Sequence, residues 1–217
     1  MYIFAGRFKG RRLFFPPMPV IAGKIRRKSS EKLRPTTGLV RRALFDILAP
    51  IISDSSFLDL YAGTGAVGLE AVSRGAGKVL LVESNPKTAL YLKQNLELIK
   101  AAAKKEGNEI AEENLMFYPY LTEKAISILA GKKEGFDIIF ADPPYDFSAQ
   151  KIAELIAQIS EGGILRPGGK IILQHISGLE KNLLFQESVS ALTLAVETRR
   201  YGYTSLSLFF PPSAPAE

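Results

Sequence analysis

One stretch restricts the fold of this chain more than any other: an apolar run that leads straight into a glycine-rich loop. The run Phe57-Leu58-Asp59-Leu60-Tyr61 is typical of a buried strand, and Ala62-Gly63-Thr64-Gly65-Ala66-Val67-Gly68 follows it, with a helical pattern beyond. Gly63 and Gly65 allow a sharp turn close to a ligand, and Gly68 allows the helix to pack closely on the strand. The pattern predicts a strand, loop and helix that bind a dinucleotide or another nucleoside.

Acidic residues near this loop favour S-adenosylmethionine as the ligand. The run from Lys78 to Glu83 predicts a second strand that ends in an acid. The Glu83 carboxylate could accept hydrogen bonds from both ribose hydroxyls, although a solvated strand end is the alternative. Asp59, just ahead of the loop, would repel a pyrophosphate but attract the sulfonium and amino groups of S-adenosylmethionine. We therefore expect this cofactor rather than a nicotinamide.

A second motif, Asp142-Pro143-Pro144-Tyr145, follows the apolar run Phe136-Asp137-Ile138-Ile139-Phe140-Ala141. The prolines fix two φ angles and lack backbone donors, so the Asp142 carboxylate and the Pro143 carbonyl form a rigid pair of acceptors. Tyr145 supplies a ring for stacking. A loop that merely ends a strand is the alternative, because Asp and Pro are common in turns. The favoured interpretation is a grip on a planar base that carries an exocyclic amine.

Predicted strands alternate with predicted helices, which favours a doubly wound α/β sheet. The predicted helices cover 35–48, 85–103, 123–129 and 148–159, and the remaining strands cover 115–118, 170–174, 191–198 and 203–210. The last two strands should form an antiparallel hairpin at one edge of a seven-stranded sheet. In the helix at 35–48, Arg41 and Arg42 fall on the side opposite the apolar positions. Both motifs and Glu83 should meet in one crevice, because ligands bind at the carboxyl ends of such strands.

Positive charge is concentrated at the start of the chain. The net charge is +6, yet residues 1–45 hold 12 Lys or Arg against one acid. Such a segment can neutralise several phosphates, although a solvated arm is the alternative. The candidates for RNA contact are Arg7, Lys9, Arg11 and Arg12. We expect a basic N-terminal arm and helix at 1–48, with poor order within 16–32, a catalytic domain at 49–212 and a tail at 213–217.

Composition narrows the remaining possibilities. The chain has no cysteine, so disulfides, thiolate nucleophiles and cysteine metal sites are excluded. No metal ion is expected. No apolar run approaches the length of a membrane span, and the first residues do not resemble a secretion signal. We expect a cytoplasmic monomer that does not contact membranes.

The chain resembles the class I S-adenosylmethionine-dependent methyltransferases, and within them the bacterial RsmD-type 16S rRNA guanine-N2 methyltransferases. The similarity covers nearly the whole chain and is carried by Ala5 through Arg11, Leu33-Arg34-Pro35-Thr36-Thr37, the glycine loop, Gly68-Leu69-Glu70-Ala71, Ser73-Arg74-Gly75, Asn95-Leu96 and Asp142-Pro143-Pro144-Tyr145. It implies a Rossmann-like fold. The cofactor residues that it implies are Asp59, Tyr61, Ala62, Gly63, Thr64, Gly65, Glu83, Ser84 and Asp142. Asp142 through Tyr145 would hold the guanine, and the basic arm with Arg34, Thr36 and Thr37 would bind 16S rRNA or a small-subunit assembly intermediate.

The implied reaction is a direct in-line displacement. Hydrogen bonds from the guanine amine to Asp142 and to the Pro143 carbonyl would turn its lone pair toward the methyl group, while Tyr145 stacks on the base. The leaving group is a neutral thioether, so neither a metal nor a covalent intermediate is required. Either Asp142 or water would accept the proton. Asp at position 142, rather than Asn, is what the resemblance associates with guanine.

Two positions depart from the resemblance, and two other functions stay open. Tyr118-Pro119-Tyr120 stands where these folds often place Asp, Asn or Ser near the adenine, which makes Tyr120 the candidate for adenine contact. His175 stands where relatives often carry an acid, and a structural role is favoured for it. An enzyme of this fold could instead methylate DNA adenine or a protein amide. A non-catalytic RNA-binding protein with a vestigial nucleoside fold is the other alternative.

Overall fold

The computed structural model describes residues 1–17, 20–21, 24–25, 38–191 and 194–210. Arg34, Thr36 and Thr37 lie outside these ranges, as does part of the segment 16–32 for which poor order was expected. Within that segment, β1 (Val20–Ile21) and β2 (Lys24–Ile25) form a separate antiparallel pair.

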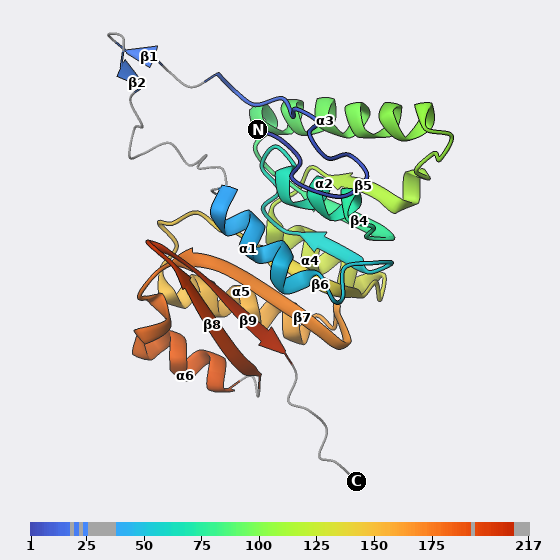
Figure 1. The fold of residues 1–217 in the computed structure, drawn as a ribbon. Helices are drawn as coiled ribbons and strands as arrows, with labels where there is room; N and C mark the ends of the chain where they lie inside the picture. The colour runs from blue at the N-terminus through green and yellow to red at the C-terminus, as the bar shows by residue number, and fades with distance from the viewer. Residues whose placement is uncertain (18–19, 22–23, 26–37, 192–193, 211–217) are drawn as a thin grey trace.

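A seven-stranded sheet forms the centre of the molecule, in the order β5-β4-β3-β6-β7-β9-β8 (Figure 1). Its strands are β3 (Ser56–Asp59), β4 (Lys78–Val82), β5 (Leu115–Tyr118), β6 (Phe136–Ala141), β7 (Leu165–Ile176), β8 (Ala195–Tyr201) and β9 (Thr204–Phe210). The pairs among β3 to β7 are parallel, whereas β9 runs antiparallel to both β7 and β8. This confirms the predicted doubly wound α/β sheet with an antiparallel hairpin at one edge.

Helices cover both faces of the sheet and enclose two hydrophobic cores. One core contains side chains of α1 (Gly38–Leu48), α2 (Ala66–Ser73) and α3 (Pro86–Lys105). The other contains side chains of α4 (Thr122–Gly131), α5 (Ala149–Glu161) and α6 (Leu183–Ala191). Two short 3-10 helices, η1 (Glu112–Asn114) and η2 (Leu179–Lys181), lie in the connections. Two-sided coverage explains why β3 is buried at every position.

The carboxyl-terminal third departs from the expected boundaries. The structure begins β7 at Leu165 and carries it through Pro167-Gly168-Gly169, where the register against β6 shifts between Phe136 and Ile138. That irregularity accommodates residues expected to form a turn. Helix α6 was not predicted, and the strand expected from 191 starts only at Ala195. Short apolar runs do not distinguish a buried helix from a strand, so packing on the sheet decides.

Arg41 corrects the expected orientation of the first helix. Its side chain is buried, with 1% exposed, instead of lying on the outer side of α1. The guanidinium donates to the carbonyls of Tyr2 and Ala66 and lies 4.1 Å from the centre of the Phe4 ring. Backbone acceptors and an aromatic face offset the cost of burying the charge. Arg42, in contrast, is exposed.

Residues 1–15 pack against α2 and α3. Ile3, Phe8 and Leu13 are buried in the same core as these helices. The buried Glu70 carboxylate accepts hydrogen bonds from the Phe4 and Ala5 amides at 2.7 and 3.0 Å. The start of the chain is therefore an integral part of the folded core.

Candidate active site

The carboxyl ends of β3, β4, β5 and β6 meet at one edge of the sheet, on the left in Figure 1. The glycine loop leaves β3 there, Glu83 follows β4, Tyr120 follows β5 and Asp142 follows β6. Parallel pairing brings together residues that are more than 80 positions apart in the chain. The sequence motifs thus converge as expected.

Glycine is required at several positions of the loop. Gly63 and Gly65 have φ values of +57° and +86°, which side chains rarely adopt. A Cβ at Gly65 would lie 2.5 Å from Leu92 Cδ1, and one at Gly68 would lie 2.1 Å from Leu81 Cδ2. The loop can therefore bend sharply while α2 packs closely on β4, as the glycine pattern predicted.

Glu83 joins the glycine loop to the start of α3. Its Oε2 accepts a hydrogen bond from the Gly63 amide at 3.0 Å, and its Oε1 accepts one from the Asn85 amide at 2.6 Å. Burial raises the pKa of this half-buried carboxyl group, while the amide hydrogen bonds oppose that effect. Each carboxylate oxygen has a second lone pair, which leaves acceptors for the hydroxyls of a ribose. Ser84 lies exposed beside it.

Asp59 is the most perturbed acid of the crevice. It is 1% exposed, and its Oδ1 accepts from the Tyr61 amide at 3.4 Å. Its Oδ2 has no hydrogen-bond partner among the residues that the structure describes. Burial, reinforced by the negative charges of Asp142 and Glu83, raises the pKa of Asp59 to about 8. A buried acceptor without a partner, close to two other acids, fits a cationic ligand such as a sulfonium or an ammonium group.

Tyr61, Ala62 and Thr64 complete the loop. Ala62 and Thr64 are buried. The ring of Tyr61 meets that of Phe147 edge to face, with 6.2 Å between centroids, and burial raises the pKa of Tyr61 to about 12. This phenol therefore stays neutral. The sequence reasoning missed Phe147, although its aromatic side chain two residues beyond the proline motif was a usable signal.

Asn95 is a second residue whose contact with the site was not foreseen. Its buried side chain lies on α3 and donates to the Thr64 carbonyl at 2.8 Å. It also forms hydrogen bonds with the amide and the carbonyl of Phe14, at 2.7 and 3.0 Å. Asn95 thereby connects the N-terminal segment to the glycine loop.

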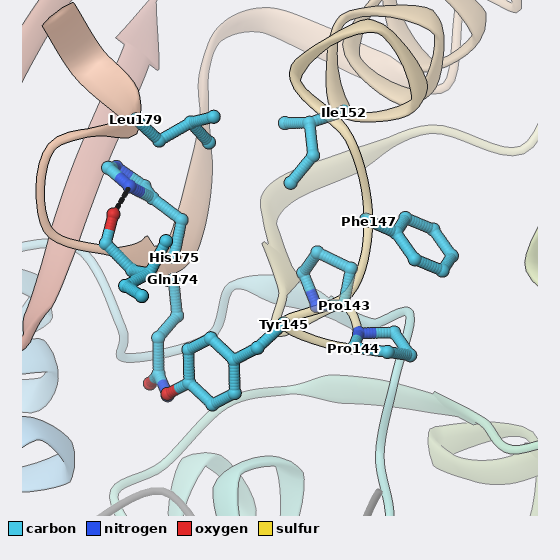
Figure 2. Close-up of a pocket in the computed structure, with 9 residues that line it drawn as sticks. Pro143, Pro144, Tyr145, Phe147, Ile152, Gln174, His175 and Leu179 are labelled. Carbon is cyan, nitrogen blue, oxygen red and sulfur yellow. Dashed lines mark hydrogen bonds between the residues drawn. The ribbon is translucent and has the colours of Figure 1, made fainter. Parts of the chain in front are cut away.

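The motif after β6 forms one wall of a small pocket (Figure 2). Pro143 is buried, whereas Asp142 is half-buried and Tyr145 is 42% exposed. The Tyr145 hydroxyl points toward Gln174, whose Nε2 lies 3.5 Å from it. An exposed ring beside two proline-fixed acceptors suits a flat base that stacks on Tyr145 while its amine faces Asp142.

Gln174 and His175, at the end of β7, line the same pocket. Gln174 is buried, and its Oε1 has no hydrogen-bond partner within the described part of the chain. This residue was expected only as part of a strand. His175 contacts the Ser207 hydroxyl through Nε2 at 2.8 Å and the Ile176 carbonyl through Nδ1 at 2.9 Å. Both ring nitrogens are thus engaged, which fits the structural role predicted for His175.

Tyr120 lies at the carboxyl end of the sheet, where the adenine contact was expected. Its ring meets Tyr118 edge to face at 5.8 Å, and Lys124 Nζ lies 4.6 Å from its centroid. The position suits contact with a flat group in the crevice, and the adenine role stays a prediction.

Two of the basic candidates near the start of the chain, Arg7 and Arg11, lie apart from the crevice. Arg7 Nε is 2.8 Å from Glu106 Oε2, and Arg11 also pairs with Glu106 at 3.4 Å. Glu106 follows α3, which starts at the crevice and is about 30 Å long at 1.5 Å per residue. Arg7 and Arg11 therefore lie near the opposite end of the strands from the crevice. Lys9 and Arg12 are exposed, and contact of all four with RNA stays a prediction.

No cluster of three or more potential metal ligands occurs among the residues that the structure describes. Within the same ranges, no helix is both long and apolar enough to cross a membrane. The crevice is lined by the acids Asp59, Glu83 and Asp142, by the glycine loop and by the proline-fixed pair of acceptors.

In the sheet, the antiparallel strand β9 lies between β7 and β8, and an acid-lined crevice lies at the carboxyl ends of the parallel strands. This fold and this site define a class I S-adenosylmethionine-dependent methyltransferase. A family model described as "Conserved hypothetical protein 95" matches residues 1–210. The chain belongs to this family, which is the RsmD-type family.

Curated relatives and solved structures agree with this family. The chain is 33% identical over 172 residues to Ribosomal RNA small subunit methyltransferase D of Haemophilus influenzae, covering 79% of this chain and 77% of the relative. It is 36% identical over 143 residues to the protein of the same name from Escherichia coli K12, which covers 66% of this chain and 59% of that relative. A structure from Escherichia coli, assigned as the methyltransferase yhhF, superposes with a TM-score of 0.72 at 25% identity over 99% of both chains.

Proposed function

We propose that this protein transfers a methyl group from S-adenosylmethionine to the exocyclic N2 amine of a guanine in 16S rRNA. The single observation that carries the proposal is the convergence of Asp59, Glu83 and Asp142 beside Tyr145 at the carboxyl edge of the sheet. Relatives named for methylation of the small-subunit rRNA support the substrate class. Asp at position 142 supports guanine.

The cofactor would lie between the glycine loop and the acids. Glu83 accepts from the ribose hydroxyls, and the left-handed backbone at Gly63 and Gly65, which carries no side chains, allows close approach. Asp59 attracts positive charge into the crevice and is held in its ionised form by it. Bound S-adenosylmethionine supplies an electrophilic methyl group whose leaving group is a neutral thioether.

The chain itself orients the nucleophile. The guanine amine is weakly nucleophilic, because its lone pair is delocalised into the ring. Hydrogen bonds from the amine to the Asp142 carboxylate and to the Pro143 carbonyl turn that lone pair toward the methyl group and stabilise the developing positive charge. The ring of Tyr145 holds the base flat after it has left its RNA stack. The proton then leaves to Asp142 or to water.

The wider assignments belong to the same proposal. Residues 49–212 would carry catalysis, and residues 1–48, including Arg34, Thr36 and Thr37, would help to hold RNA. The substrate is naked 16S rRNA or an assembly intermediate of the small subunit. The protein would act as a monomer in the cytoplasm, where ribosomes are assembled.

Methyl transfer from labelled S-adenosylmethionine tests the proposal. The acceptors are 16S rRNA and partly assembled small subunits from cells that lack this enzyme, and digestion to nucleosides identifies the product. We expect N2-methylguanine from the unaltered protein and none from Asp142→Ala. The matched control is Asp146→Ala, an exposed acid of the same loop, which should retain activity. Label in DNA adenine or in a protein amide, with none in rRNA, would overturn the substrate assignment.

A further inference from the structure

The turn between β8 and β9 lies at the same end of the sheet as the active site, where the parallel strands have their carboxyl ends (Figure 1). Ile176, the last residue of β7, pairs with Thr204, and the Ser177 amide donates to the Tyr203 carbonyl at 3.0 Å. Gln174, which contacts Tyr145, lies two residues earlier on β7, or about 7 Å at the usual rise. The turn therefore lies close to Tyr145, on which the base would stack.

Side chains at this turn are basic, aromatic and exposed. Tyr203 is 91% exposed, more than any other large hydrophobic side chain in the described ranges. Arg199 and Arg200 precede it on the edge strand β8, and both are exposed. Arg199 pairs with Glu197 at 2.8 Å, with about half of each side chain open to solvent. Such an exposed pair is weak, so a phosphate could replace the glutamate.

Protection of a free sheet edge is the plainest alternative explanation. Charged residues on an edge strand prevent it from pairing with another chain, and β8 is the outermost strand. This accounts for the arginines on β8. It does not involve the aromatic ring of Tyr203, which lies on the turn with 91% of the residue exposed. A single-stranded nucleic acid, with phosphates for the arginines and a base for the ring, would account for both features.

The proposed RNA site needs cations that Arg7 and Arg11 do not supply at the crevice. Those two arginines are paired with Glu106 at the far end of α3. We infer that the β8–β9 hairpin, with Arg199 and Arg200 on opposite faces of the edge strand and Tyr203 on the turn, is a second RNA-binding element that holds the single-stranded segment next to the target guanine. The arginines would contact phosphates, and Tyr203 would stack on a neighbouring base. This inference rests on the proposed function, because it assumes that RNA enters the crevice.

RNA binding across a range of salt concentrations tests this element. We expect the double variant Arg199→Ala/Arg200→Ala to raise the Kd for 16S rRNA about tenfold and to flatten the plot of log Kd against log salt by roughly 1.4 to 1.8, for two lost phosphate contacts. Tyr203→Ser should weaken binding about tenfold with an unchanged salt slope, and Tyr203→Phe should restore it. Affinity for S-adenosylmethionine should stay unchanged in all three.

A charge-matched control removes two cations elsewhere. Lys132→Ala/Lys133→Ala changes exposed residues just after α4, which packs in the other core from residues 1–15, and should leave the affinity near that of the unaltered protein. If the hairpin variants match the unaltered protein in Kd and slope, or lose no more than this control, the inference is wrong. Methyl transfer to rRNA by the unaltered protein is measured first, so failure of the proposed function is recognised separately. Thermal unfolding confirms that each variant is folded.

Discussion

Replacing Asp59 with asparagine should stabilise the cofactor-free protein, and should do so more at high pH than at low pH. The pKa of Asp59 is about 8 in the folded state, against an ordinary value of 3.8. Between these values the folded protein holds a proton that the unfolded chain has lost. Stability therefore falls as pH rises from about 4 to about 8 and then levels off. Asparagine fills the same space and does not titrate.

The size of the effect follows from the pKa difference. A pH of 7 lies about three units above the ordinary pKa of Asp59. At ~1.4 kcal/mol per unit, the free energy of unfolding at pH 7 is therefore about 4 kcal/mol lower than at acid pH. This is an upper limit, because relaxation and water entry weaken the effect of burial. For a chain of this length, about 4 kcal/mol corresponds to an increase in Tm of roughly 10 °C.

Thermal unfolding at pH 5, 7 and 9 measures this effect. The difference in Tm between Asp59→Asn and the unaltered protein should grow from pH 5 to pH 9, and Asp46→Asn, at an exposed position of α1, is the matched control. Calorimetry in buffers of different ionisation enthalpy should detect proton release when S-adenosylmethionine binds at pH 7, and this release should vanish in Asp59→Asn. A difference in Tm that is independent of pH would refute the reasoning.

Substitutions at three further positions test the rest of the site. Asp142→Ala should lower kcat for methyl transfer by about 100-fold or more while changing the Kd for S-adenosylmethionine little, as read by single-turnover kinetics and calorimetry. Tyr145→Phe, which keeps the ring and loses only the contact with Gln174, should retain most activity, whereas Tyr145→Ala should raise the KM for RNA about tenfold or more in steady-state assays. Gly65→Ala forces a side chain into a φ of +86° and to within 2.5 Å of Leu92, so it should lower stability by about 1–3 kcal/mol in urea unfolding and weaken cofactor binding.

Local sequence patterns were sufficient to predict structure wherever a backbone conformation admits essentially one residue type. The glycine loop could be predicted, because positive φ at Gly63 and Gly65 and close packing at Gly68 admit little else. The position of Asp142 and its two prolines could also be predicted, because they directly follow an apolar run that forms the buried strand β6. Alternation of strands and helices then placed both motifs at one edge. Boundaries near β7 and α6 could not be predicted, since short apolar runs suit either a helix or a strand until they pack.

The sequence by itself thus determined the class of fold, the identity of the motifs and the chemistry that they suit. Only the tertiary structure decided which polar side chains are buried and what they contact. Arg41 looked like a surface residue, yet it lies beneath Phe4 with backbone carbonyls as partners. RNA contact by Arg7 stays a prediction, but its pairing with Glu106, 99 positions away, could be seen only in the folded chain. The charge and periodicity of a segment depend on neighbouring residues, whereas burial and pairing depend on residues brought close by folding.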